Sequence, residues 1–202
     1  MTLRNGMVDL VQELRTLTIA GTADWTLGTV TYWTDDQLQA VLDKYRVDFF
    51  ASELVEQEQY VGPTGDPTTA GSVIYKRFTT AYKNLETIAS GTPYFAVTYA
   101  NGGTVVEAFT ADYTNGILDF TNNQRGTPLY LTGRSFDVNQ AAADIWTRKA
   151  NYYSQAYDIK TDNHSLTRSQ LYKQAMSQAE YFKSQSDAGA AVSIDFERSD
   201  TR

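Results

Sequence analysis

The single histidine is the first residue to consider for catalysis, because His164 is flanked by Asp162 and Ser165. A hydrolytic triad combines a carboxylate, an imidazole and a hydroxyl nucleophile, and all three groups stand here side by side. The same order of residues is also ordinary for a turn that precedes a helix. The chain has no nucleophile elbow and no glycine-rich oxyanion loop, so we interpret His164 as a loop residue and expect no catalytic residues and no enzyme.

Oxygen ligands for a metal ion gather at two places, Asp35-Asp36 and the stretch from Asp158 to Asn163. Asp35 and Asp36 are better explained as first-turn residues of a helix, where the helix dipole favours negative charge. The second stretch lacks the glycine and the distal glutamate of a calcium loop. The glycine-rich segment 62–71 lacks the Lys-Ser/Thr ending of a phosphate loop. We therefore predict no metal site and no cofactor.

Aromatic residues in the middle of the chain offer another kind of site, a platform on which sugars or bases stack. A platform needs several rings on one exposed face, whereas such rings more often form the core and the cross-strand pairs of a sheet. The residues concerned are Tyr94, Phe95, Tyr99, Phe109, Tyr113 and Phe120. A carbohydrate-binding β module therefore stays open as an alternative function.

The composition narrows the possible partners. The 202 residues are 42% apolar and carry a net charge of −7, so the chain can build a core but does not attract nucleic acid. DNA that passes nearby without being held is not excluded. There is no cysteine, which rules out disulfides and thiolate metal sites. The sequence has no apolar run near the roughly 20 residues of a membrane span and no signal-peptide pattern, so we expect a soluble, cytoplasmically made protein without a membrane partner.

Near both ends of the chain, apolar residues recur at the three- and four-residue spacing of an α-helix. Leu3 to Leu17 is spaced as one amphipathic helix, and a second begins at Thr34, whose capping box is completed by Gln37. Its expected buried residues are Leu38, Val41, Leu42, Tyr45 and Phe49. Phe136 to Ser186 reads as two helices joined by a polar connection, Asp158–His164, and so predicts an antiparallel helical hairpin.

The middle of the chain has the period of strands. Segment 62–71 must be a loop, and Asn101-Gly102-Gly103 and Asn115-Gly116 are strong turn signals. The expected strands are Val73–Phe78, Tyr94–Tyr99, Thr104–Phe109, Ile117–Phe120 and Leu129–Thr132. The expected fold class is therefore α+β, a helical bundle with a C-terminal αα-hairpin and an inserted antiparallel β region.

This reading divides the chain into four parts. Residues 1–61 would hold the N-terminal helices of the bundle, 72–133 the inserted β-hairpin region, 134–186 the C-terminal helical hairpin and 187–202 an extended tail. In the tail, Val192, Ile194 and Phe196 alternate with polar residues after a small-residue linker. That alternation suits strand addition to the sheet edge of another protein.

The order of several short motifs resembles a group of tailed-phage head–tail connector (adaptor) proteins. The resemblance spans roughly Tyr75 to Phe182, and no single motif is diagnostic. The motifs are Asn84-Leu85-Glu86, Asp112-Tyr113 with Asn115–Phe120, Leu131-Thr132-Gly133 with Phe136-Asp137, Ala141–Asp144, and Asp162–Ser165 with Arg168-Ser169-Gln170.

The resemblance implies a structural virion protein of the neck, at the head–tail interface, assembled in the host cytoplasm. Members form a ring, usually dodecameric, that extends the DNA channel beneath the portal and docks a neck, stopper or tail-terminator protein. Their C-terminal segment commonly reaches the portal, a role that would fall here to Val192, Ile194, Phe196 and Arg198.

An acidic channel would repel the DNA backbone, so the genome could pass without specific binding. Glu53, Glu56 and Glu58, expected at the end of the second helix, are candidates to line it. The alternative within virion assembly is a tail-completion or tail-terminator protein, which would be mainly β and bind the tail tube.

Overall fold

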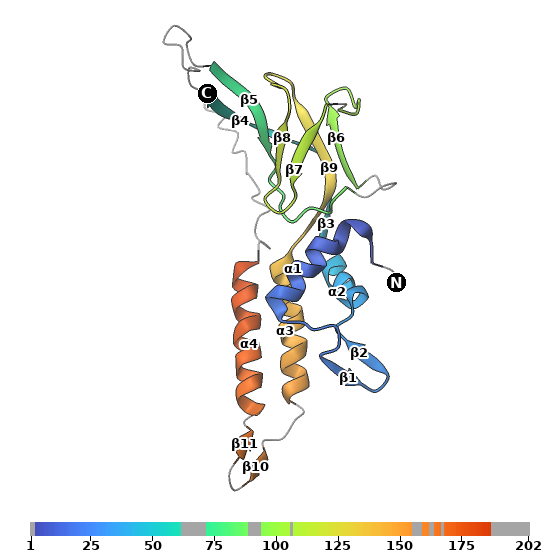
Figure 1. Cartoon of the computed structure of the whole chain (residues 1–202), viewed down its shortest axis with the longest axis vertical. Coiled ribbons are helices and arrows are strands. Elements are labelled where there is room, and N and C mark those ends of the chain that lie inside the picture. Colours follow the sequence, from blue (N-terminus) through green and yellow to red (C-terminus); the bar gives the residue numbers. More distant parts are fainter. Residues whose placement is uncertain are drawn as a thin grey trace, which may run out of the picture. The chain divides into compact units, whose positions relative to one another are not determined.

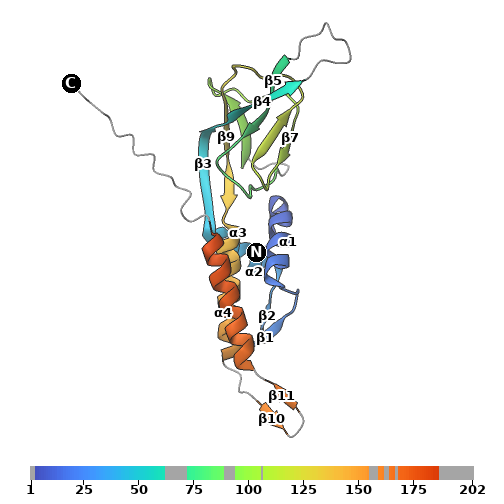
Figure 2. The same ribbon diagram turned by 90° about the vertical axis from the view of Figure 1, so that its left-hand side faces the viewer.

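The computed structural model describes residues 3–61, 72–88, 94–105, 107–154, 159–161, 164–166 and 168–186. The chain divides into two compact units, Met1–Val138 and Asn139–Arg202. Figure 1 gives the order and labels of the elements, and Figure 2 shows the same chain after a quarter turn.

The first unit opens with two short helical segments. α1 (Val8–Thr18) follows a 3-10 turn, η1 (Asn5–Met7), and α2 (Asp35–Leu42) continues into η2 (Asp43–Tyr45). The capping box predicted at Thr34 is present, since the Gln37 side chain accepts a hydrogen bond from the Thr34 backbone N–H at 3.0 Å. Between the helices lies a small hairpin that the sequence did not predict, β1 (Trp25–Leu27) and β2 (Val30–Tyr32).

The expected fold class, a helical bundle with an inserted β region, is wrong. The described residues form mainly antiparallel sheet, with four α-helices among them. Tyr45 and Phe49 continue the helical spacing of α2, but the helix ends at Leu42 and the chain is extended from Arg46 onward. Pairing along the whole of β3 and β4 outweighs that spacing, because β-branched and aromatic residues gain more by packing on a sheet.

Besides the β1–β2 hairpin, the described part of the first unit contains two larger antiparallel sheets (Figure 2). One has the order β3-β9-β6 and the other the order β4-β5-β8-β7. The strands are β3 (Arg46–Glu53), β4 (Val55–Val61), β5 (Ser72–Thr79), β6 (Phe95–Tyr99), β7 (Phe109–Asp112), β8 (Ile117–Phe120) and β9 (Leu129–Phe136). Of the expected return strand Thr104–Phe109, Thr104 makes a single bridge with Thr98 and Phe109 begins β7.

A shared apolar core joins the two sheets. Phe78 and Leu118 from one sheet are fully buried, as are Leu129 and Leu131 from the other. Aromatic rings meet edge to face within this core, Phe78 with Phe120 at 5.4 Å and Phe95 with Tyr113 at 5.2 Å between ring centroids. The two sheets therefore form a sandwich around one core, because each supplies inward side chains that the other covers.

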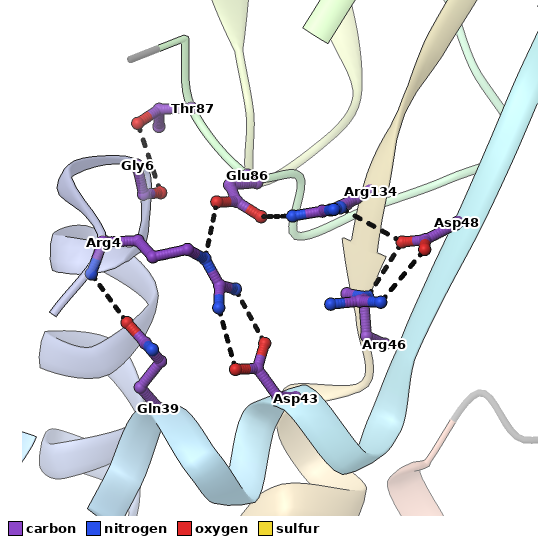
Figure 3. A network of polar contacts seen from close by, with 9 residues as sticks. All are labelled: Arg4, Gly6, Gln39, Asp43, Arg46, Asp48, Glu86, Thr87 and Arg134. Atoms are coloured by element: carbon purple, nitrogen blue, oxygen red, sulfur yellow. Dashed lines mark hydrogen bonds and ion pairs between the residues drawn. The ribbon is translucent and has the colours of Figure 1, made fainter. Parts of the chain in front are cut away.

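A network of ion pairs ties the N-terminal segment to the sheets (Figure 3). The guanidinium of Arg4 makes two hydrogen bonds to Asp43, at 2.7 and 2.8 Å, and a third to Glu86 at 3.0 Å. These hydrogen bonds, that to Asp43 first, raise the pKa of Arg4 above its ordinary value. Arg134 of β9 reaches the other oxygen of Glu86 at 3.6 Å and Asp48 of β3 at 3.3 Å.

The second unit is a helical hairpin with a small β-hairpin between its helices. α3 (Val138–Ser154) and α4 (Arg168–Gln185) lie where the sequence predicted helices. They run antiparallel, since the Asn139 side chain at the start of α3 donates to the Gln185 carbonyl at the end of α4. The expected polar connection contains β10 (Ile159–Thr161) and β11 (His164–Leu166), with Thr161 opposite His164.

Removing Arg4 tests the network. Arg4→Met leaves Glu86, only 3% exposed, without its closest cation. We expect a loss of about 3 kcal/mol of unfolding free energy, because a buried charge that loses its partner is costly. Arg77→Met, which breaks the half-exposed pair with Asp119, is the control and should cost no more than about 1 kcal/mol. Urea titrations of both variants measure the difference, and equal losses would contradict a special role for Arg4.

The β7–β8 turn offers a second test. Gly116 has φ +68°, and a Cβ placed there would lie 2.1 Å from the carbonyl oxygen of Tyr82. Gly102 has φ +80° with no heavy atom within 4 Å of its Cβ position. Gly102→Ala should cost about 1 kcal/mol through its backbone alone. Gly116→Ala should cost several times more and lower the melting temperature accordingly; similar melting temperatures for the two variants would refute the close approach.

Candidate functional site

One continuous stretch of chain forms the edge of both sheets in the first unit. Arg46–Val61, which we call the edge segment, contains β3, Leu54 and β4 (Figure 1). Among the described strands, β3 is the outermost of its sheet and β4 the outermost of the other. A long strand with an outer edge is a natural place for another chain to dock.

Large apolar side chains stand out from the edge segment. Phe50 is 80% exposed, Tyr60 70%, Val55 62% and Val47 51%. Exposed apolar residues are common singly, but several along one segment indicate a surface that is covered in an assembly. The edge segment is therefore the candidate functional site.

Phe50 points away from the buried Phe49, as neighbours on a strand do, and the backbone becomes irregular directly after it, at Ala51. The pairing of β3 with β9 shifts register between Phe49 and Ser52, and Ala51 takes φ +47°, a left-handed value that is unfavourable for a residue other than glycine. The Ala51 N–H donates to the hydroxyl of Thr132 instead of to the strand ladder. Phe49 is buried and stacks on Tyr82, with 3.9 Å between ring centroids, while Phe50 faces solvent.

Negative charge accompanies these apolar side chains. Glu53 ends β3, and Glu56 and Glu58 lie in β4, not at a helix end as the sequence led us to expect. Glu53 and Glu56 line a shallow depression of about 470 Å³ together with Leu54, Val55, Gly126 and Pro128. Farther along the segment, Arg46 pairs with Asp48 at 2.9 Å, so the three glutamates dominate its charge.

Glu58 is tied to the neighbouring strand. Its carboxylate accepts a hydrogen bond from the hydroxyl of Tyr75 in β5 at 2.9 Å, which raises the pKa of Tyr75. The guanidinium of Arg125 lies 5.7 Å from the centre of the Tyr75 ring. The acidic side of the edge segment is thus held by contacts with β5.

The residues considered for chemistry are not assembled into a reaction centre. His164 lies in β11, but its side chain, Asp158, Asp162 and the stretch 62–71 fall outside the described residues. Asp35 pairs with Arg15 at the start of α2, as a first-turn carboxylate. Within the described ranges no group of three or more metal-binding side chains is placed to hold an ion, and none of the helices there is long and apolar enough to cross a bilayer.

The aromatic platform is not formed as a sugar-binding site requires. Phe95 and Phe120 are buried in the core, and Tyr99, Phe109 and Tyr113 pack against it. Tyr94 is covered by the guanidinium of Arg134, 3.2 Å from its ring centre. These rings serve packing, so they do not offer several faces to one ligand.

The tail residues Val192, Ile194, Phe196 and Arg198 also lie outside the described part of the chain. Sequence reasoning missed Phe50, Val55 and Tyr60. Residues 56–59 are all polar and show no apolar–polar alternation, so the sequence carried no local signal for this strand. No protein-family model matches the chain, and neither a curated protein nor a solved structure does.

The exposure of Phe50 predicts that its ring adds nothing to the stability of an isolated subunit. Phe50→Ser should change the unfolding free energy by no more than about 0.5 kcal/mol, as for other exposed sites. Phe49→Ser, one residue earlier and buried, should cost about 3 kcal/mol or more. Chemical denaturation of both variants at low protein concentration checks this, and a large loss for Phe50→Ser would mean that its ring packs within the subunit.

Proposed function

We propose that the chain is a structural subunit of a tailed-phage neck, a head–tail connector that forms a ring beneath the portal, extends the DNA channel and docks the next neck or tail protein. The observation that carries the proposal is the edge segment, because its exposed apolar side chains suit a subunit that is covered on assembly. The order of motifs between Tyr75 and Phe182 supports the same class of protein.

The charge distribution suits a channel through which DNA moves. The first unit holds nine of the basic and 16 of the acidic residues, so the whole net charge of the chain resides there. A ring of such units presents a negative field to the phosphate backbone, which keeps DNA from adhering to the wall. Partner binding then falls to apolar and tail segments rather than to basic patches.

A tail-completion or tail-terminator protein is the second candidate. The observation in its favour is the predominance of antiparallel sheet among the described residues, since such a protein would be mainly β. It would bind the tail tube, whereas a connector binds the portal. The carbohydrate-binding alternative loses its support, because the rings that it requires are packed in the core.

The mass of the complexes separates these candidates. Light scattering would be measured on the purified protein alone, mixed with the portal of the same virion, and mixed with the tail tube. A connector joins the portal in equal copy number and ignores the tail tube. If the protein binds only the tail tube, the tail-terminator assignment replaces the connector assignment. If it binds neither, both assignments are wrong.

The tail gives a further prediction. Deleting residues 188–202 should abolish or strongly weaken joining to the portal, because Val192, Ile194, Phe196 and Arg198 are proposed to dock there as an added strand. The variant Val192→Ser/Ile194→Ser/Phe196→Ser, which keeps the tail length, should behave like the deletion. Thermal melting of both proteins controls for folding. If both variants bind the portal as well as the unchanged protein does, the tail does not contribute to the portal contact.

A further inference from the structure

We propose that the turn after β6 is a site of spontaneous covalent modification, at which the side-chain amide of Asn101 is lost to attack by the backbone nitrogen of Gly102. The products after hydrolysis are aspartate and isoaspartate. Water is the co-reactant and ammonia the group that leaves, so no second protein takes part. The proposal concerns the folded first unit and does not depend on the proposed function.

The chain contains three Asn-Gly pairs, Asn5-Gly6, Asn101-Gly102 and Asn115-Gly116. In such a pair the backbone nitrogen of the glycine can attack the side-chain carbonyl carbon of the asparagine, because glycine has no Cβ to crowd the approach. The reaction requires that the glycine N–H is free and that the backbone can bring the two atoms together. The sequence makes the three pairs equal candidates, and their surroundings in the structure separate them.

The Asn101-Gly102 pair is open to the reaction. Both residues are exposed, in the turn between β6 and Thr104. Apart from its chain neighbours, no heavy atom lies within 4 Å of the position that a Cβ of Gly102 would take. The Gly102 N–H donates to the carbonyl of Tyr99 at 2.9 Å, a hydrogen bond within the same exposed turn. Such a turn can open without disturbing the core, which frees the nitrogen for attack.

The side chain of Asn101 is also polarised for the reaction. Its Oδ1 accepts a hydrogen bond from the Gly103 N–H at 2.9 Å. Negative charge develops on this oxygen when a nitrogen adds to the carbonyl carbon, and a donor that is already in place stabilises that charge. The turn therefore supplies both the attacking nitrogen and a hydrogen bond to the developing oxyanion.

The Asn115-Gly116 pair is held in place. The side-chain amide of Asn115 donates to the carboxylate of Asp112 at 2.8 Å, and its backbone N–H donates to the same carboxylate at 3.1 Å. Gly116 is buried, its N–H donates to the Asp112 carbonyl and its own carbonyl accepts from the Thr80 N–H, both at 2.9 Å. The nearby carboxylate also disfavours negative charge on the amide oxygen. This pair can react only when the turn comes away from Thr80.

The Asn5-Gly6 pair is held by a different contact. It lies in η1, and Gly6 is buried. The Gly6 carbonyl accepts a hydrogen bond from the Thr87 N–H at 3.1 Å. Movement of this backbone would separate the N-terminal segment from Thr87, so we expect the pair to be protected in the folded protein.

The proposed step balances with water alone. The Gly102 nitrogen gives its proton to hydroxide or water and bonds to Cγ of Asn101. The bond from Cγ to Nδ2 breaks, and Nδ2 takes up a proton and leaves as ammonia. Water then opens the resulting cyclic imide at either of its carbonyl carbons. Attack at one carbon leaves an aspartate, and attack at the other carries the main chain through the former side chain and leaves an isoaspartate.

The modification would change the outer side of β6. Both products add a negative charge beside Gly103, and isoaspartate also lengthens the main chain of the turn by a methylene group. Directly after the turn, Thr104 bridges Thr98, and the N–H of the buried Val105 donates to the Val97 carbonyl at 3.0 Å. A longer turn shifts this pairing, so modified copies should differ from new ones along β6.

Peptide mapping of the full-length protein tests the proposal. One sample is kept folded and another unfolded in urea, each at neutral and at mildly alkaline pH, and both are digested in acid before mass spectrometry. In the folded protein Asn101 should convert at least about tenfold faster than Asn115 or Asn5, because those two are held by hydrogen bonds to other segments. In urea the three rates should become similar. All rates should rise with pH, because the attacking nitrogen must lose its proton.

Two results of this mapping would refute the proposal. One is a rate at Asn115 or Asn5 of the folded protein that equals or exceeds the rate at Asn101. The other is an Asn101 that reacts in urea and stays intact in the folded protein, since the turn would then protect it.

Gly102→Ala tests the route through the cyclic imide. The added Cβ obstructs the attacking nitrogen, so Asn101 should convert at least about tenfold more slowly. Gly28→Ala in the β1–β2 hairpin is the matched control, because Gly28 also has a positive φ, +62°, and open space at its Cβ position. It should leave the rate at Asn101 unchanged, and thermal melting compares the folding of both variants.

The products give the last readout. The Asn101→Asp variant supplies the chromatographic reference for the aspartate peptide, and the cyclic imide predicts a second peptide of the same mass that contains isoaspartate. Conversion that yields aspartate alone, or that is undiminished in Gly102→Ala, would mean direct hydrolysis by water and would overturn the attack by Gly102.

Discussion

The first unit depends on one buried carboxylate. Glu86 lies outside the named strands, yet it accepts from Arg4 at the start of the chain and faces Arg134 in β9. A carboxylate is buried only when cations and hydrogen bonds replace water, so the segments that carry those cations must be in place together. Through Asp43 and Asp48 the same cations reach η2 and β3. One desolvated carboxylate thus links the N-terminal segment with the sheets.

Around that carboxylate, the remaining stability is of the usual apolar kind. Phe78, Leu118, Leu129 and Leu131 are buried between the two sheets, and the glycine of β9, Gly133, lets the ring of Phe49 lie against the strand. Many of the aromatic side chains of the chain are buried in this core or pack against it. This explains why a chain with many aromatics does not present them together as a binding platform.

Caps, turns and single helices could be predicted from the sequence, whereas the fold class could not. The capping box at Thr34, the Asn115-Gly116 turn and the two long helices rest on short-range chemistry, and each is present. The edge segment was misassigned because Tyr45 and Phe49 happen to continue a helical spacing that only pairing with β9 and β5 overrides. Of the candidate site, the sequence singled out Glu53, Glu56 and Glu58, but as channel-lining residues at a helix end, and it did not single out the exposed Phe50.

The continuity of the edge segment has a mechanical consequence. β3 and β4 are one covalent strand, interrupted only by Leu54, and each is hydrogen-bonded along its length to a different sheet. A pull along this strand would load both ladders at once and in shear, so that many hydrogen bonds resist together rather than opening one after another. Leu54 itself is buried, which anchors the junction in the core. The sandwich would therefore bear tension along this strand as a single body.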